Sequence, residues 1–264
     1  MVFLFIKAGQ RNILNANFAP MKETTRIFGI RTVIEAIESG KSIEKIFIQK
    51  GLSGSLFQEL NRYLNKGNFT VSYVPVEKLN KLSKGNHQGV VANISPISFV
   101  SLEKLVEDSQ NSTSTPLFLL LDGLTDVRNF GAIIRTAECC GVTGIIIPEK
   151  GSAPINADAV KTSAGAVFKI PICKVNHIKD AIFHLQTYDI KTVAATEKTD
   201  DVIYDLDLKQ PIAIIMGNEE KGVSNSILKS ADFKAKLPML GTIASLNVSV
   251  ACGAFLYEAV RQRL

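Results

Sequence analysis

The chain has 264 residues, of which 46% are hydrophobic and 21% charged, and its formal net charge is +5. This composition is typical of a globular protein, and the length predicts two domains or one large α/β domain. No apolar run approaches the roughly 18 residues that span a bilayer, so we expect no membrane segment.

The first residues, "MVFLFIKAGQR", lack a basic start, and their apolar run is too short for a signal peptide. A domain pattern begins near Met21 with "MKETTRIFGIRTVIEAI", so we expect residues 1–25 to be an extension that the fold does not need. The four cysteines have neither the C-x-x-C spacing of a zinc site nor a disulfide-framework pattern. We therefore expect no metal, and cysteines that behave as small buried hydrophobes in a reducing cytoplasm.

Short apolar runs alternate with helical patterns in the first part of the chain. The expected strands are "IEKIFIQ" (43–49), "FTVSYV" (69–74) and "GVVANI" (89–94), and the expected helices lie near 31–39 and 55–65. This alternation predicts a small α/β domain over residues 26–107. The polar stretch "DSQNSTSTP" (108–116), which ends in proline, predicts a linker.

Continuous Leu and β-branched runs alternate with helical patterns in the second part, residues 117–264. The expected strands are "LFLLLD" (117–122), "TGIIIP" (143–148), "KTVAAT" (191–196) and "IAIIMG" (212–217), and the last helix covers about 247–262. Such runs are typical of a parallel sheet that helices cover on both faces. The fold class is therefore α/β.

The positive charge lies in the first part of the chain. Residues 1–115 contain 14 Lys and Arg against 9 Asp and Glu, whereas residues 116–264 contain 16 of each kind. A basic domain joined to a neutral one indicates either a docking surface for a polyanion or an ordinary solvated surface.

The ends of the expected strands hold the candidate functional residues, because parallel sheets bind ligands at their carboxyl edge. The segment "GNEEKGVS" (217–224) has the glycine spacing of a P-loop, but Val223 occupies the lysine position and two glutamates would repel a triphosphate. We therefore reject nucleotide hydrolysis. The dinucleotide signature G-x-G-x-x-G is missing from every strand–helix junction.

A second strand end continues as "DGLTDVRNFGAIIRTAECCG" (122–141). We expect Asn129 to cap the helix that follows and Gly141 to end it. Arg135 lies among apolar neighbours of that helix, so its guanidinium either reaches the surface or is held by an anion.

The loop before the last helix, "LPMLGTIASLNVSVACG" (237–253), is polar and contains glycine. A loop in this place is typical of a functional segment, because no further element needs connecting. Ser245 and Asn247 are also suited to capping the last helix.

Three segments in order resemble the three motifs of the SpoU (TrmH-like) branch of the SPOUT methyltransferases, which methylate the ribose 2′-hydroxyl of RNA. They are "NFGAIIRTAE" (129–138), "IMGNEEKGVS" (215–224) and "LPMLGTIASLNVSVACGAFLYEAVRQR" (237–263). Upstream, "FGIRTVIEAI" and "HQGVVA" resemble the ribosomal-protein-L30e-like RNA-binding module of bacterial 23S rRNA guanosine 2′-O-methyltransferases. The resemblance covers about residues 26–264. Val127 departs from it, because many members have proline there.

The resemblance implies an L30e-like N-terminal domain and a C-terminal parallel-sheet SPOUT domain with a deep trefoil knot. It implies S-adenosylmethionine as the cofactor, held by Thr196, Gly217, Leu237, Met239 and Leu246. It also implies a catalytic set made of Arg135, Asn129, Glu219, Ser245 and Asn247.

The chemistry of these groups suggests their roles. A guanidinium stays protonated, so we assign Arg135 to clamping the phosphate beside the target ribose rather than to acting as a base. Glu219 would orient Arg135 or the hydroxyl. Asn129, Ser245 and Asn247 would position substrate and loop.

We therefore expect a cytoplasmic RNA ribose 2′-O-methyltransferase that acts on a guanosine of 23S rRNA as a homodimer formed through its catalytic domain. Small residues in the last helix, such as Gly253 and Ala254, allow another helix to approach, or they pack against their own sheet. Two other functions stay open: a tRNA ribose 2′-O-methyltransferase, and a catalytically silent RNA-binding factor in ribosome assembly. The presence of Asn129, Arg135, Glu219 and Asn247 argues against silence.

Overall fold

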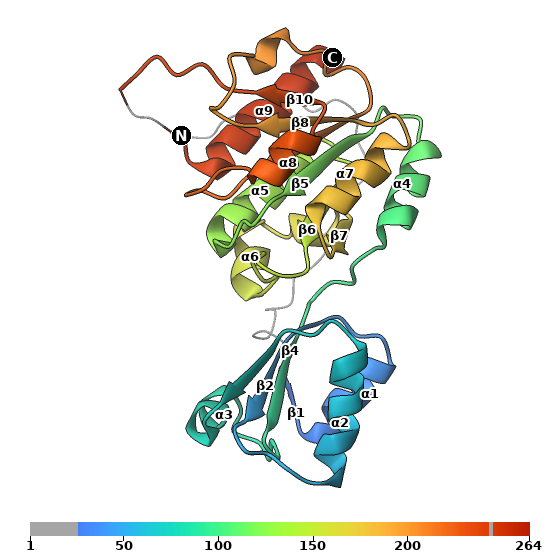
Figure 1. Ribbon diagram of the computed structural model, residues 1–264, viewed down its shortest axis with the longest axis vertical. Helices are drawn as coiled ribbons and strands as arrows, with labels where there is room; N and C mark the ends of the chain where they lie inside the picture. Colours follow the sequence, from blue (N-terminus) through green and yellow to red (C-terminus); the bar gives the residue numbers. More distant parts are fainter. Residues whose placement is uncertain (1–25, 243–244) are drawn as a thin grey trace.

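The computed structural model describes residues 26–242 and 245–264, which form a small and a large α/β domain (Figure 1). The predicted N-terminal extension lies outside the described residues. None of the described helices is long and apolar enough to cross a membrane.

The small domain contains a four-stranded sheet in the order β1-β4-β2-β3. Strand β2 is parallel to β3, and the other pairs are antiparallel. Helices α1 and α2 share one core with the sheet, and α3 covers its other face through Leu79. The elements are β1 (Arg26–Phe28), α1 (Ile30–Glu38), β2 (Ile43–Gln49), α2 (Ser55–Lys66), β3 (Val71–Val74), α3 (Val76–Leu82) and β4 (Val90–Ile94).

The large domain contains a six-stranded sheet in the order β10-β8-β9-β5-β6-β7. All its strand pairs are parallel, which confirms the predicted α/β parallel-sheet fold. The strands are β5 (Leu117–Leu121), β6 (Gly144–Pro148), β7 (Ile172–Val175), β8 (Lys191–Ala195), β9 (Ile212–Met216) and β10 (Phe233–Ala235). The helices of this domain after β5 are α5 (Val127–Cys139), α6 (Ala157–Thr162), α7 (Ile178–Gln186), α8 (Asn225–Ser230) and α9 (Val248–Arg263).

The side chains of β5 explain how both faces of this sheet are covered. Leu117, Leu119 and Leu121 pack in one core with α5, α6 and α9, whereas Phe118 and Leu120 pack in the other with α7 and α8. A strand alternates its side chains between faces, so a continuous apolar run fits only a strand that is covered on both sides.

Helix α4 (Leu102–Gln110) belongs to the large domain by its packing. Its Leu105 and Val106 lie in the same core as Phe118 and Leu120. The polar stretch 108–116, which we predict as a linker, therefore begins inside α4.

The start of α5 differs from the prediction. The N-cap is Asp126, whose carboxylate accepts a hydrogen bond from the backbone N–H of Asn129 at 2.7 Å, so the expected capping role of Asn129 is wrong. Both residue types cap helices well, and the earlier one takes the position. The side-chain amide of Asn129 is therefore not used for capping and can make other contacts. Gly141 follows the C-cap with φ of 69°, which confirms it as the helix stop. Just before it, Cys139 is exposed and Cys140 is half-buried, so the expected burial of the cysteines is wrong for these two.

The two domains touch beside the ends of β6 and β7. The Glu44 carboxylate accepts a hydrogen bond from the Ile155 N–H at 3.0 Å, and the Asn68 amide donates to Asn176 at 2.9 Å and to Glu149. Burial raises the pKa of Glu44 and lowers the pKa of Lys174, and the attraction between these two charges opposes both shifts.

Candidate functional site

A cavity of about 460 Å³ lies over the carboxyl ends of β8, β9 and β10, beside the start of α9. We call it the cofactor cavity. Its floor is apolar and is formed by Met216, Val248, Ala251 and Phe255. Its rim carries charged side chains: Glu197, Lys198, Glu219, Glu220, Lys221 and Lys236.

All five residues predicted to bind the cofactor line this cavity. They come from separate loops: Thr196 follows β8, Gly217 follows β9, Leu237 and Met239 follow β10, and Leu246 precedes α9. Thr196 and Gly217 are buried, whereas Met239 and Leu246 are each 43% exposed. The structure thus brings together residues that lie up to 50 positions apart in the sequence.

Gly217 is required by a close approach of the backbone. Backbone hydrogen bonds in both directions join Asn218 and Gly222, at 2.8 and 3.2 Å, and close a turn. A Cβ atom at Gly217 would lie 2.1 Å from the carbonyl carbon of Gly222 and from the nitrogen of Val223. Only glycine fits there without moving the loop.

Sequence reasoning missed Asn218, which also lines the cavity. Its amide nitrogen donates to the Gly123 carbonyl at 2.9 Å, and its Oδ1 accepts from the Glu220 N–H at 2.9 Å. The second bond is an Asx turn, for which Asn after Gly217 is a recognisable signal.

Three predicted catalytic residues form a hydrogen-bonded chain that reaches the cavity at Glu219. The Asn247 amide donates to Asn129 Oδ1 at 3.1 Å, and the Asn129 amide donates to Glu219 Oε1 at 2.8 Å. Asn247 also caps α9, because its Oδ1 accepts from the Ser249 N–H at 2.9 Å. The chain joins one residue from each of the three sequence segments.

The other two predicted residues are placed differently. Ser245 lines the cavity. Arg135 is exposed on α5, and it is not among the residues that line the cavity. Arg135 is six positions after Asn129, which turns its side chain about 240° around the helix axis relative to that of Asn129. Within one chain, Arg135 therefore does not share a face with the hydrogen-bonded chain.

The residues of the cavity fit the implied cofactor. S-adenosylmethionine carries a sulfonium and an ammonium, which carboxylates attract, and an adenosine that packs on an apolar surface. Glu197, Glu219 and Glu220 supply the carboxylates, and the floor supplies the apolar surface.

Comparison with known proteins agrees with this geometry. The family model described as "SpoU rRNA Methylase family" matches residues 116–257, and the model described as "RNA 2'-O ribose methyltransferase substrate binding" matches residues 26–100. The chain is 35% identical to the 23S rRNA (guanosine-2'-O-)-methyltransferase RlmB of Pseudomonas aeruginosa, over 92% of this chain and 98% of that protein. It is 32% identical to the putative TrmH family tRNA/rRNA methyltransferase YacO of Bacillus subtilis, over 90% and 95%.

The fold also resembles a solved structure that contains the expected cofactor. The SpoU methyltransferase AviRb of Streptomyces viridochromogenes, in complex with AdoMet, superposes with a TM-score of 0.58 at 27% identity, covering 90% of each chain. The predicted family, enzyme class and cofactor are thereby confirmed. The chain belongs to the SpoU rRNA methylase family and is an S-adenosylmethionine-dependent RNA 2′-O-methyltransferase.

Proposed function

We propose that the protein transfers a methyl group from S-adenosylmethionine to the ribose 2′-hydroxyl of a guanosine in 23S rRNA. The observation that carries the proposal is the hydrogen-bonded chain of Asn247, Asn129 and Glu219, which reaches the cofactor cavity at Glu219. The similarity to a 23S rRNA guanosine 2′-O-methyltransferase along nearly its whole length supports the choice of substrate.

The loops after the strands hold the cofactor. Gly217 brings the backbone close enough for its polar groups to reach the adenine edge, and Leu237 and Leu246 cover the apolar part. We expect α9 to belong to a deep trefoil knot, which would explain why Leu246, a residue of the cofactor cavity, lies so close to the C-terminus. The bound cofactor supplies an electrophilic methyl group.

The remaining groups act on the RNA. The 2′-oxygen attacks the methyl carbon as the bond from carbon to sulfur breaks, and the hydroxyl proton must leave. Glu219, which Asn129 holds in place, orients the hydroxyl. Arg135 clamps the phosphate next to the target ribose, and that phosphate accepts the proton.

The position of Arg135 supports a homodimer. Val250 and Tyr257 lie seven residues apart on α9, so they share one helix face, and they are 58% and 56% exposed. Pairing through α9 would cover this face and would bring Arg135 of one protomer to the cavity of the other. We expect light scattering at micromolar concentration to give a dimer, and the charged variant Tyr257→Glu to give a monomer. A wild-type monomer would contradict this part of the proposal.

The small domain would bind the RNA substrate, and residues 117–264 would carry the methyl transfer. The surplus of positive charge before residue 116 and the substrate-binding family model over residues 26–100 support this division. Since rRNA is its substrate, the protein would work in the cytoplasm.

The test compares ribose methylation of rRNA and tRNA from cells with and without the gene. We expect one 2′-O-methylguanosine of 23S rRNA to disappear with the gene. Loss of a tRNA ribose methylation instead would favour the tRNA alternative, which the similarity to the putative tRNA/rRNA methyltransferase of Bacillus subtilis leaves open. Unchanged methylation in both RNAs would contradict the proposed substrate.

A further inference from the structure

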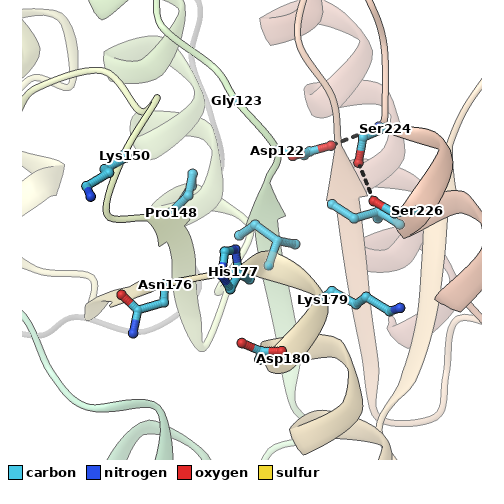
Figure 2. A pocket seen from close by; sticks show the side chains of 12 residues that line it. Asp122, Gly123, Pro148, Lys150, Asn176, His177, Lys179, Asp180, Ser224 and Ser226 are labelled. Carbon is cyan, nitrogen blue, oxygen red and sulfur yellow. Dashed lines mark hydrogen bonds between the residues drawn. The ribbon is translucent and has the colours of Figure 1, made fainter.

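A second cavity, of about 470 Å³, lies at the same edge of the large sheet, over the ends of β5, β6 and β7. We call it the flanking cavity (Figure 2). None of the residues to which we assign a role in methyl transfer lines it. Its lining residues are Asp122, Gly123, Pro148, Lys150, Asn176, His177, Ile178, Lys179, Asp180, Ser224, Ser226 and Ile227.

The flanking cavity adjoins the cofactor cavity. Gly123 lines the flanking cavity and Asn218 lines the cofactor cavity. The Asn218 side-chain amide donates to the Gly123 carbonyl at 2.9 Å. The Ser224 N–H donates to the Asp122 carboxylate at 2.8 Å, which ties the loop after β9 to the wall of the flanking cavity. The two cavities are therefore neighbours, and the hydrogen bond from Asn218 to Gly123 joins a lining residue of each.

The flanking cavity also adjoins the small domain. Asn176 lines it and accepts the hydrogen bond from Asn68 of that domain at 2.9 Å. Glu149, the residue before Lys150, accepts a second bond from the same Asn68 amide. The cavity thus lies between the domain that we propose to bind RNA and the cavity where the methyl group is transferred.

The side chains around it offer several kinds of contact. Figure 2 shows Lys150 and Asn176 on one side of His177, with Lys179 and Asp180 on the other. Within the part of the chain that the structure describes, the side chains of Lys150 and His177 make no hydrogen bond or ion pair. His177 holds the N-cap position of α7 without capping it, so its ring is available to a ligand.

This mixture of groups fits a nucleotide better than a simple anion. Two carboxylates, Asp122 and Asp180, would repel an inorganic anion, but carboxylates and the Asn176 amide pair with the donors and acceptors of a base edge. Ammonium groups contact phosphates, and an imidazole face stacks on a base.

We infer that the flanking cavity binds an unpaired nucleotide of the substrate RNA that neighbours the methylated one. Lys150 contacts its phosphate, and His177 stacks on its base. This inference rests on the proposed function only in taking RNA as the ligand.

The experiment measures the affinity of the full chain for a 23S rRNA transcript in the absence of S-adenosylmethionine. We expect His177→Ala to weaken binding about tenfold, the scale of one lost stacking contact. Lys150→Ala should weaken binding through the loss of one phosphate contact. Lys150→Ala should also reduce the salt slope by about 0.7, whereas His177→Ala should leave it unchanged. Affinity for S-adenosylmethionine and the thermal midpoint should stay at wild-type values for both.

The matched control is Lys209→Ala. Lys209 is exposed and precedes β9, so it lies at the opposite edge of the parallel sheet. It should bind RNA as the wild type does. Wild-type RNA affinity in both test variants would overturn the inference, as would an equal loss in Lys209→Ala. Because the readout is binding, a protein that binds RNA in this way without methylating it would contradict the proposed function and leave the inference standing.

Discussion

Gly217→Ala should separate binding of the cofactor from the folding of the domain. The added Cβ would meet backbone atoms of Gly222 and Val223 at 2.1 Å, and backbone atoms cannot rotate away as a side chain can. The turn between Asn218 and Gly222 must therefore shift, and with it a wall of the cofactor cavity.

The size of the effect follows from the cost of overpacking, about 1–3 kcal/mol. Contacts with backbone place this case near the upper end, and about 3 kcal/mol corresponds to roughly a hundredfold loss of affinity. If only the turn moves, the domain keeps its stability, and the cost appears when the cofactor requires the original turn. Any part of the cost that falls on folding would lower the thermal midpoint by about 2–4 °C for each kcal/mol.

Calorimetry with S-adenosylmethionine measures the affinity, and a melting curve measures the stability. The matched control is Gly241→Ala, because a Cβ at Gly241 meets no atom of residues 26–242 or 245–264 within 4 Å and this residue does not line the cavity. We expect the control to bind as the wild type does. Wild-type affinity in Gly217→Ala would refute the role given to this close approach.

Three further predictions address the division of roles. Arg135→Ala should abolish methyl transfer to RNA while calorimetry shows normal cofactor binding and circular dichroism a normal fold, because Arg135 is exposed and Ala favours helix; near-normal turnover would move the activating role to Glu219. Leu246→Arg should weaken cofactor binding, since it places a cation against the sulfonium, and an unchanged dissociation constant would argue that Leu246 does not cover the cofactor. A fragment that starts at Ser101 keeps α4 on its sheet and should bind S-adenosylmethionine. It should methylate RNA poorly, and its RNA binding should depend less on salt. Full activity on natural RNA would contradict the role of the small domain.

The central strands were the most predictable part of the fold. The run "LFLLL" is apolar at every position because β5 is covered on both faces, and this pattern fixes its bounds to within one residue. The strands β1, β7 and β10 were not predicted. They lie at the edges of their sheets, two have only three residues, and β7 carries Lys174, whose ammonium lies 4.0 Å from the Phe99 ring.

The site was predictable in its residues but not in its contacts. The resemblance named five of the residues that line the cofactor cavity as cofactor-binding residues, each of which follows a strand or precedes α9. The bonds from Asn129 to Glu219 and to Asn247 join positions 90 and 118 residues apart, and no local pattern specifies such pairs. The expected capping role of Asn129 was wrong because Asp126 caps α5. The side-chain amide of Asn129 makes these two long-range bonds instead. The flanking cavity has no sequence signal, because packing of separate loops creates it.

The most direct test of the central claim is methyl transfer by the purified protein. The full chain is incubated with S-adenosylmethionine labelled in its methyl group and with either a 23S rRNA transcript or bulk tRNA, and the RNA is digested to nucleosides. We predict label in 2′-O-methylguanosine from 23S rRNA, and none when Arg135→Ala replaces the wild type. Label in a methylated base, or in tRNA alone, would contradict the account.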